Sequence, residues 1–299
     1  MSKKTNKSSA STPISRCSST STSLSTLNND TISEFREAVR SLPLYQTYHL
    51  RTDDAFLLRF LKTAKNNLKK ALKRYQAYYQ LIVNLPRSQE FTSGSVQDRQ
   101  WLHDLRTHLD TEIMKNNNYP SFGYYGTDKK GRAIIGFEAS TCEPFLHLEN
   151  YLDACLYLSI VVFDYILEHY DSCQDNGFVM IDDWHGLSFK MFKFFMSNRT
   201  FVSNFSALIS GSLPMRINQY YIVNGPKLMN VMYNAFKIFL SEKIKSRMFF
   251  AGSVGVVADD IGVESVPVFL KNGVRSHVDL TQIDLEEQLG KIFPRKRGL

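Results

Sequence analysis

The residues with the types and spacing for acid–base chemistry are His185 and the two aspartates just before it, Asp182 and Asp183. A histidine oriented by a carboxylate can serve as a general base, so these residues could belong to a hydrolase. A loop at a strand end, in which an aspartate bonds the local backbone, explains them more simply. The sequence contains no GxSxG, GxGxxG, GxxxxGK(S/T) or HExxH motif. We therefore expect that the protein is not an enzyme, and keep the hydrolase as an alternative.

The cysteines and histidines show no pattern of metal ligands. The four cysteines, Cys17, Cys142, Cys155 and Cys173, form no CxxC pair, and the seven histidines are scattered. We expect neither a disulfide framework nor a metal site, and no motif points to a cofactor. Cysteines without a disulfide pattern are typical of a reducing compartment, so a cytoplasmic protein is the default expectation.

Lysine and arginine outnumber aspartate and glutamate, which gives a formal net charge of +7 and a pI near 9.1. This balance predicts an anionic partner, either a nucleic acid or an acidic membrane surface. The run 69–74 beside Tyr75, Tyr78 and Tyr79 could bind a nucleic acid through phosphate contacts and base stacking. Those tyrosines fall on the apolar face of an expected helix, which favours packing instead. We therefore expect no nucleic-acid partner, and keep this function as a weaker alternative.

Two kinds of membrane-directed segment are not supported. The most apolar stretch, 152–167, contains Asp153 and Asp164, so it lacks the about 18 uninterrupted apolar residues of a membrane span. The first residues, Met-Ser-Lys-Lys-Thr, lack the apolar core of a secretory signal. We expect neither a spanning helix nor a secreted protein.

The elements that must position these residues begin with a helical lobe. Residues 1–29 are rich in Ser and Thr and contain no acidic residue, which predicts a disordered tail. A helix is expected from Thr31, because Thr31 and Glu34 have capping-box spacing. Further helices are expected at 55–63, 68–83 and 97–116. We thus expect a helical lobe at 30–116.

Short β-branched and aromatic runs alternate with helical patterns in the rest of the chain. The runs end at turn signals such as Asn224-Gly-Pro226. We expect strands at 133–137, 178–181, 220–223, 247–251 and 263–268. Strands that alternate with helices predict an α/β fold with a mainly parallel sheet covered on both faces.

The helix expected at 227–240 is the most informative element. Pro226 suits its first turn, and apolar residues cover far more than one of its faces. Such a helix touches a core on one side and something removable on the other, for which a ligand cavity is one explanation. An ordinary buried helix between the sheet and a neighbour is the other.

Several motifs occur in a fixed order along the chain. They are Asp54–Lys62, Asp183-x-x-Gly186-x-Ser, Leu213-Pro-x-Arg216, Asn224-Gly-Pro226 and Phe239-Leu-Ser-Glu-Lys-Ile-Lys-x-Arg247. The first resembles the small helical lobe, and the others the lipid-binding domain, of the CRAL-TRIO family. Within that family the motifs are most similar to the members that carry α-tocopherol and retinaldehyde. The chain departs from the family pattern at Ile238, where proline is usual, and after Pro267, where a Gly-Gly pair is usual.

The resemblance implies that the helical lobe is followed, at 117–285, by an α/β/α sandwich, and at 286–299 by a basic tail. In the sandwich, a mobile helical lid at 226–240 would cover a hydrophobic cavity. The implied function is to bind a small hydrophobic lipid, such as a tocopherol, a retinoid or an isoprenoid, and transfer it between membranes. The residues expected to form the cavity wall are Phe163, Ile181, Leu187, Phe189, Leu208, Ile209, Leu213, Val231, Met232, Ala235 and Phe236.

The resemblance also implies a cleft that grips phosphoinositide head groups, so that an acidic membrane surface is a transient partner. The expected cleft residues are Lys62, Arg216, Lys243 and Arg247, and a further basic position of the cleft is Asn218 here. We expect a monomeric, cytoplasmic protein that associates reversibly with membranes. The main alternative is a phosphatidylinositol-binding signalling scaffold of the same fold.

Overall fold

The computed structural model describes residues 29–93, 107, 122–148, 151–278, 280 and 283–298. The expected tail at 1–29, apart from Asn29, lies outside the described residues, and so does the expected helix at 97–116, apart from Thr107. The described residues form a helical lobe, a five-stranded sheet and helices on both faces of that sheet.

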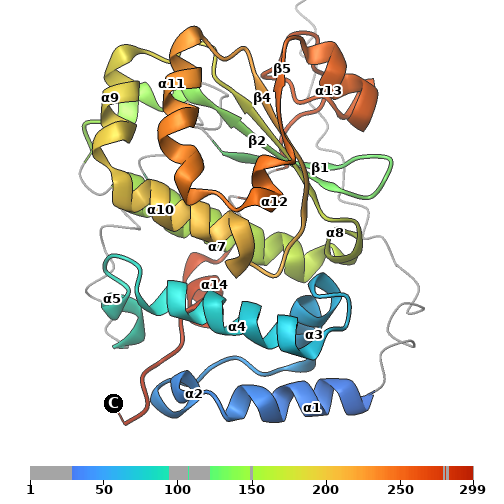
Figure 1. Ribbon diagram of the computed structural model, residues 1–299, viewed down its shortest axis with the longest axis vertical. Helices are drawn as coiled ribbons and strands as arrows, with labels where there is room; N and C mark the ends of the chain where they lie inside the picture. The colour runs from blue at the N-terminus through green and yellow to red at the C-terminus, as the bar shows by residue number, and fades with distance from the viewer. Residues whose placement is uncertain are drawn as a thin grey trace, which may run out of the picture.

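Short helices form the N-terminal lobe (Figure 1). They are α1 (Asn29–Arg40), α2 (Pro43–Thr47), α3 (Asp54–Thr63), α4 (Leu68–Val83) and α5 (Gln89–Thr92). The Asp53 carboxylate fixes the start of α3, because it accepts a hydrogen bond from the backbone N–H of Phe56 at 3.0 Å. Asn67 caps α4 in the same way, through the backbone N–H of Lys70 at 2.9 Å. Helix α1 begins at Asn29, ahead of the capping box expected at Thr31.

Aromatic side chains fill the core of this lobe. Phe56, Phe60, Tyr75, Tyr78 and Tyr79 are at most 1% exposed. Their ring centroids lie 5.0–6.2 Å apart, mostly edge to face, which is the preferred arrangement of packed aromatic rings. The three tyrosines are therefore not available to stack on bases, and the nucleic-acid alternative loses the feature that supported it.

Five strands form one sheet in the order β1-β2-β3-β4-β5. They are β1 (Gly123–Thr127), β2 (Ala133–Glu138), β3 (Phe178–Asp183), β4 (Ile217–Val223) and β5 (Met248–Ala251). Strands β1 and β2 form an antiparallel hairpin, and β2 to β5 run parallel. This mostly parallel α/β sheet confirms the expected fold class.

Helical crossovers join the parallel strands, as parallel pairing requires. Helices α7 (Tyr151–His169) and α8 (Asp171–Asn176) lie between β2 and β3. Helices α9 (Phe189–Ser197) and α10 (Arg199–Ala207) and the π-helical segment η5 (Leu208–Ser212) lie between β3 and β4. Helix α11 (Lys227–Phe236), the 3₁₀ turn η6 (Lys237–Phe239) and helix α12 (Glu242–Lys245) lie between β4 and β5. Two 3₁₀ turns, η3 (Ala139–Thr141) and η4 (Glu143–Phe145), follow β2, and α13 (Val254–Ile261) follows β5.

Residues 263–268 do not form the expected strand. Val263–Ser265 is a short 3₁₀ turn, η7, and Pro267 makes one isolated bridge to Arg275. Proline has no backbone N–H and cannot continue a ladder of strand hydrogen bonds, which explains the difference. The sheet instead contains β1, which the sequence analysis did not expect.

The sheet separates two cores, because side chains alternate between its faces. On one face Phe178 and Met180 of β3 join the larger core, which also contains residues of α7, α10 and α11. On the other face Val179 and Ile181 join a smaller core with Val257 and other residues of α13. In Figure 1, α9, α10 and α11 lie to one side of the strands and α13 to the other. The two-residue period of β3 therefore decides which side chains reach which core.

The residues expected to form a basic tail, 286–299, pack against the rest of the fold over their described part, 286–298. Helix α14 (Leu285–Ile292) packs on α7 and buries Leu289 and Ile292 to 1% exposure. Beyond it, the backbone N–H of Arg297 donates to the carbonyl of Thr47 at 2.8 Å. Leu285, Leu289 and Ile292 have helical spacing, which the basic composition of the last residues obscured.

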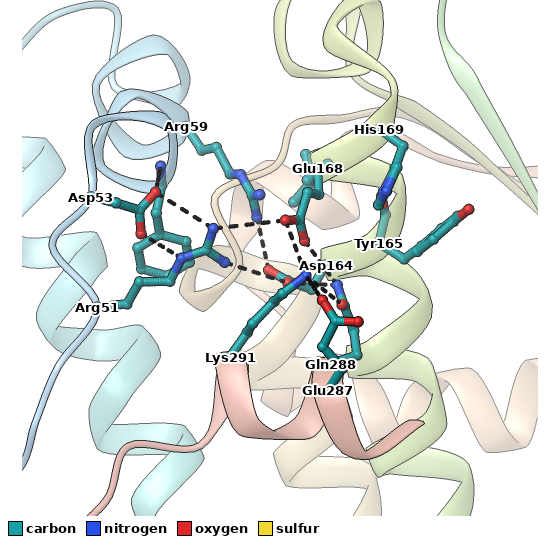
Figure 2. Close-up of polar contacts among 12 residues, drawn as sticks. Arg51, Asp53, Arg59, Asp164, Tyr165, Glu168, His169, Glu287, Gln288 and Lys291 are labelled. Atoms are coloured by element: carbon teal, nitrogen blue, oxygen red, sulfur yellow. Dashed lines mark hydrogen bonds and ion pairs between the residues drawn. The ribbon is translucent and has the colours of Figure 1, made fainter. Parts of the chain in front are cut away.

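A buried ionic network joins the lobe, α7 and α14 (Figure 2). Asp164 of α7 is 3% exposed and accepts hydrogen bonds from Nη1 of Arg59 at 2.8 Å and from Nε2 of Gln288 at 3.1 Å. Two further contacts extend it, from Arg51 Nη1 to Asp164 at 3.9 Å and from Lys291 Nζ to Glu168 at 3.3 Å. We call Arg51, Arg59, Asp164, Glu168, Gln288 and Lys291 the Asp164 network. It connects three segments that lie far apart in the sequence.

Candidate ligand-binding site

A cavity lies between the sheet face of the larger core and helices α7, α10 and α11. Its volume is about 270 Å³, measured as the space open to the centre of a water-sized sphere. One water needs about 10–15 Å³ on that measure, so the cavity far exceeds a packing defect. Hydrocarbon and aromatic side chains form most of the wall, which suits an apolar ligand. The hollow expected behind the segment after Pro226 is therefore present.

One face of α11 closes this cavity. The lining residues of α11 have the i, i+3, i+4, i+7 spacing of a single helical face, and are Met229, Met232, Tyr233 and Phe236. Of the other residues expected from this helix, Val231 is 56% exposed and Ala235 is partly exposed, and neither lines the cavity. Apolar residues occur on more than one face of α11, so its composition did not reveal which face points inward.

Of the remaining expected wall residues, one lines the cavity, and the others are buried elsewhere or exposed to solvent. Ile209 of η5 lines the cavity. Ile181 faces the smaller core, because alternation along β3 turns it to the opposite side of the sheet. Phe163 is fully buried but lies about 100° around α7 from the lining residue Val162. Phe189, at the start of α9, is 70% exposed.

Three more expected wall residues are buried in the larger core without lining the cavity, namely Leu187, Leu208 and Leu213. Leu187 lies in the turn after β3, Leu208 is the first residue of η5, and Leu213 directly follows η5. A motif resemblance carries over a position along the chain, whereas the direction of a side chain depends on the local turn.

Helices α7 and α10 supply wall residues that the sequence analysis missed. On α7 they include Tyr151, Leu152, Cys155, Leu158, Ser159 and Val162. On α10 they are Phe201, Val202, Phe205 and Ser206. Both sets recur at intervals of three and four residues, so helical periodicity was the signal that could have found them.

Asp182 is the only acid among the described lining residues, and no lysine, arginine or histidine is among them. It is 6% exposed, and the Tyr220 hydroxyl donates to its Oδ2 at 2.5 Å. Burial in this apolar wall raises the pKa of Asp182 to about 7, against the opposing effects of Tyr220 and Trp184. The sequence analysis considered Asp182 only as a neighbour of His185. The two-residue strand period, which places Asp182 on the face of Met180, could have identified it.

The next residue, Asp183, fixes a turn. Its Oδ1 accepts hydrogen bonds from the backbone N–H of His185 at 2.8 Å and from the side-chain amide of Asn224 at 3.1 Å. Among the hydrogen bonds of the described residues, none joins this carboxylate to the His185 ring, which is the contact that the hydrolase alternative requires. The carboxylate thus bonds the local backbone, as the simpler interpretation of the sequence has it.

Basic side chains from separate elements meet where the lobe borders the starts of β4 and β5. We call Arg74, Arg216, Lys243 and Arg247 the basic cluster. Burial, followed by repulsion from Arg247, Arg74, Arg216 and Lys65, lowers the pKa of Lys243. Within the described residues no carboxylate forms an ion pair with the cluster, and Glu242 instead pairs with Lys245 at 2.7 Å. Cations that lack a protein counter-charge suit an anion that carries several negative charges.

Contacts with the lobe explain which expected residues come together. Arg74 donates from Nη1 to the carbonyls of Leu213 at 3.0 Å and Met215 at 2.9 Å, which places α4 beside Arg216. The sequence analysis considered Arg74 only as part of the basic run 69–74 and did not include it in the expected cleft. Three of the four expected cleft residues, Arg216, Lys243 and Arg247, are in the cluster.

Two other positions of the expected cleft have partners elsewhere. Lys62 is 3.2 Å from the carboxylate of Asp175 on α8. Lys62 therefore bridges α3 and α8. Asn218 donates its amide to the carbonyl of Asn176, so it holds the start of β4 and contributes no charge.

Comparison with known proteins identifies the family. The model of the CRAL/TRIO domain matches residues 117–271, which is more than half of the chain. The chain belongs to the CRAL/TRIO family. The model of the CRAL/TRIO N-terminal domain also matches, at residues 31–77, within the helical lobe. This family of lipid-binding and lipid-transfer proteins supports a lipid-binding role for the chain.

The CRAL/TRIO chain has several known relatives. It is 30% identical to clavesin-2 from Homo sapiens and from Rattus norvegicus over 233 residues, which cover 76% of this chain and 63% of clavesin-2. It is 27% identical to clavesin-1 from Xenopus laevis over 235 residues, with the same shares. The chain thus spans less than two thirds of the length of these relatives. The comparisons support the CRAL/TRIO family, but not the tocopherol- and retinaldehyde-carrying subgroup to which the motifs are most similar.

A solved structure shows the same CRAL/TRIO architecture. The crystal structure of Sfh5 superposes with a TM-score of 0.51 over 88% of this chain and 92% of that chain, at 11% sequence identity. At this identity the likeness concerns the fold alone. It agrees with a helical lobe followed by a mostly parallel sheet with covering helices.

Two other kinds of site do not occur in the part of the CRAL/TRIO chain that the structure describes. None of its described helices has the length and hydropathy needed to cross a bilayer. No group of three described His, Cys, Asp or Glu side chains is arranged to hold a metal ion. The candidate site therefore consists of the cavity, the helix that closes it and the basic cluster.

Proposed function

We propose that this CRAL/TRIO protein carries one small hydrophobic lipid in its cavity and transfers it between membranes without catalysing a reaction. The observation that supports this most is a large apolar cavity closed by one face of α11. We call α11 with η6 the lid. The lid contributes no strand to the sheet, so it can swing away without breaking sheet hydrogen bonds. Its movement opens the cavity and exposes Met229, Met232 and Phe236.

Burial of the lipid tail supplies the binding energy. Each buried methylene contributes about 0.8 kcal/mol, so a long aliphatic or isoprenoid tail gains on the order of 10 kcal/mol before ordering costs. A membrane offers the same tail a comparable gain. Exchange between the two is therefore close to balanced, as a transfer protein requires.

The basic cluster provides docking at an acidic membrane surface, with phosphoinositides as the preferred head groups. Each cation near an anionic surface contributes about 1 kcal/mol, so four of them give a transient attachment. Exposed apolar side chains on the lid and on α9 add contact with lipid, namely Phe189, Val231 and Ile238. We propose that the protein is cytoplasmic and visits membranes reversibly.

Tocopherols, retinoids and other isoprenoids are the cargo that the motif resemblance favours. The main alternative is a signalling scaffold that holds phosphatidylinositol. The cavity wall counts against a phosphate inside, because its described residues include Asp182 and no lysine, arginine or histidine. We therefore assign phosphate groups to the basic cluster outside the cavity.

Native mass spectrometry of the purified chain, followed by lipid extraction, tests the cargo. We expect one uncharged lipid per protein molecule. A phospholipid as the only cargo would favour the scaffold. A protein that carries no lipid and takes none up from vesicles would contradict the carrier function.

A vesicle-to-vesicle transfer assay tests docking. The double variant Lys243→Ala with Arg247→Ala should transfer about tenfold more slowly to vesicles that contain phosphoinositides, and at an unchanged rate to neutral vesicles. The matched control is Lys129→Ala with Lys271→Ala, which removes the same charge from two exposed lysines outside the cluster. Equal rates for the two double variants on phosphoinositide vesicles would reject this docking surface.

A further inference from the structure

Three polar side chains gather at the carboxyl end of β3, within an apolar wall. Asp182, Trp184 and Tyr220 all line the cavity, and the rings of Phe137 and Phe195 pack against Trp184 at 5.3 and 6.2 Å between centroids. The Tyr220 hydroxyl already donates to Asp182. The Trp184 indole N–H is also buried. It lies near enough to Asp182 to lower the pKa of that carboxyl, but it makes no hydrogen bond of normal geometry with the described residues. A buried donor without a partner is rare in folded proteins and calls for an acceptor.

Among the described residues of the cavity wall, no cation neutralises the carboxyl of Asp182. The titratable side chains that share the wall, from the turn before α7, from α7, β4 and α11, are Cys142, Tyr151, Cys155, Tyr220 and Tyr233, and none of them is a base. Burial raises the pKa of Asp182 to about 7, so near neutral pH both of its forms are present. The protonated form can donate and accept a hydrogen bond, whereas the ionised form can only accept.

This chemistry separates lipids by their head groups. A carboxylate or phosphate beside Asp182 would place two like charges in a poorly screening medium. An ammonium head would form a buried ion pair, and the cost of removing two charges from water commonly exceeds their attraction. A hydroxyl or carbonyl oxygen costs far less to bury, and meets two donors, the Trp184 indole and the protonated carboxyl.

We propose that Asp182 and Trp184 form a polar end of the cavity, which selects lipids with one uncharged hydroxyl or carbonyl head group and rejects anionic head groups. This inference rests on the proposed carrier function and names the chemistry of its cargo. Tyr220 is a positioning residue, because it orients Asp182 through the bond to Oδ2.

Three lipid probes that share a long saturated hydrocarbon tail test the polar end on the intact protein of residues 1–299. They are hexadecanol, heptadecan-2-one and hexadecanoic acid, and binding is followed by displacement of the uncharged dye diphenylhexatriene. Above about pH 8 we expect hexadecanol to bind about tenfold more tightly than the acid. The ketone only accepts hydrogen bonds, so its affinity should fall about tenfold as the pH rises through about 7. Hexadecanol can also donate, and its affinity should stay nearly constant.

Three variants assign this behaviour to residues. Asp182→Asn keeps the size of the side chain and an N–H donor but cannot ionise, so ketone binding should lose its pH dependence and the acid should gain affinity. Tyr220→Phe removes a donor that lowers the pKa of Asp182, so the midpoint of the ketone profile should move to higher pH. Tyr221→Phe, which removes a hydroxyl from the next residue of β4 on the opposite face of the sheet and outside the cavity wall, is the matched control and should keep the wild-type profile.

The possible results separate the polar end from the carrier function. The polar end is overturned if the affinity for the ketone does not vary with pH in the wild type, or varies equally in Asp182→Asn, even though all three probes bind. If the dye and all three probes fail to bind, the carrier function itself is wrong. Should Asp182→Asn misfold by near-ultraviolet circular dichroism, the midpoint shift in Tyr220→Phe decides, and its absence counts against the inference.

Discussion

Two aspartates of this protein are almost equally removed from water but have opposite surroundings. Asp164 on α7 is 3% exposed and bonded to Arg59 and Gln288, with Arg51 beyond them (Figure 2). Asp182 on β3 is 6% exposed and accepts a hydrogen bond from the hydroxyl of Tyr220, with no cation among the described residues of its cavity wall. One carboxylate lies inside a closed set of protein partners, and the other faces a cavity.

The difference shows that the partners of a buried carboxyl, more than its depth, set its role. A buried charge must be paired, or its group must become neutral. The protein supplies the pairs at Asp164, which joins the lobe, α7 and α14 into one structure. At Asp182 burial raises the pKa to about 7, so the neutral form is favoured below that pH, and hydrogen-bonding capacity is left for a ligand.

The largest expected effect comes from breaking the paired aspartate. Asp164→Ala leaves Arg59, which is 1% exposed, as a buried charge without its main partner. We expect the free energy of unfolding in urea to fall by about 3–5 kcal/mol. The double variant Asp164→Leu with Arg59→Met should recover most of that loss, because it replaces both charges by apolar groups. A loss below about 1 kcal/mol in the single variant would mean that the network is not what holds the lobe.

Removing the charge of Asp182, which has no cationic partner among the described wall residues, should raise the free energy of unfolding, whereas Asp164→Ala lowers it. The folded-state pKa of Asp182, about 7, lies above its ordinary value of 3.8, so the native protein binds more protons than the unfolded chain between these values. Stability should therefore fall as the pH rises from about 4 to about 7, and stay low above that range. Asp182→Asn should be more stable than the wild type by roughly 2–4 kcal/mol at about pH 8.

Urea denaturation over a pH series measures this effect. The stability gap between Asp182→Asn and the wild type should narrow steadily as the pH falls from about 7 towards about 4. The same series on Tyr233→Phe gives the baseline of a wall variant that lacks the carboxyl change. A gap that does not vary with pH would show that Asp182 keeps the same charge in the folded and unfolded states.

The smallest effect is expected at the edge of the Asp164 network. Glu168 is 24% exposed and lies 3.3 Å from Lys291. Burial raises its pKa, but the hydrogen bond from Gln288 and the charges of Lys291 and Arg51 outweigh this and lower it overall. Glu168→Gln should cost about 0.5–1 kcal/mol at neutral pH, and less at high salt. This contribution is present above the ordinary pKa of 4.5 and is lost as the pH falls through the lower folded value.

Urea denaturation at low and at high salt separates the edge of the network from its centre. A loss in Glu168→Gln as large as that in Asp164→Ala would contradict the distinction between them. A salt-independent loss would show that packing, and not charge, explains the contribution of Glu168.

Features with local signals could be predicted from the sequence. The limits of α4 follow from Asn67 as its cap and from a regular apolar face, and the expected helix at 68–83 coincides with it. The aromatic and β-branched run at 220–223 lies within β4, which ends as expected before the Asn224-Gly-Pro226 turn. In each case the residues that determine the element lie within it or next to it.

Features that depend on side-chain direction or on distant partners could not be predicted in this way. The assignment of Ile181 to the cavity required the phase of β3 relative to two different cores. The assignment of Val231 and Ala235 on α11 to the cavity wall was wrong, because the sequence of a helix that is apolar on several sides does not indicate which face points inward. Arg74 reaches the basic cluster through contacts with residues about 140 positions later, and no pattern within α4 reports such a contact.

The order in which the chain is made has a consequence for the cavity wall. Leu280, Ile283 and Leu285 line the cavity, although they follow all five strands in sequence. During translation the lobe and the sheet emerge from the ribosome before these leucines and this isoleucine do. A nascent chain at that stage has a pocket that still lacks one side. If the protein carries a lipid as we propose, we expect the lipid to be retained only after residues 280–285 have packed onto the cavity.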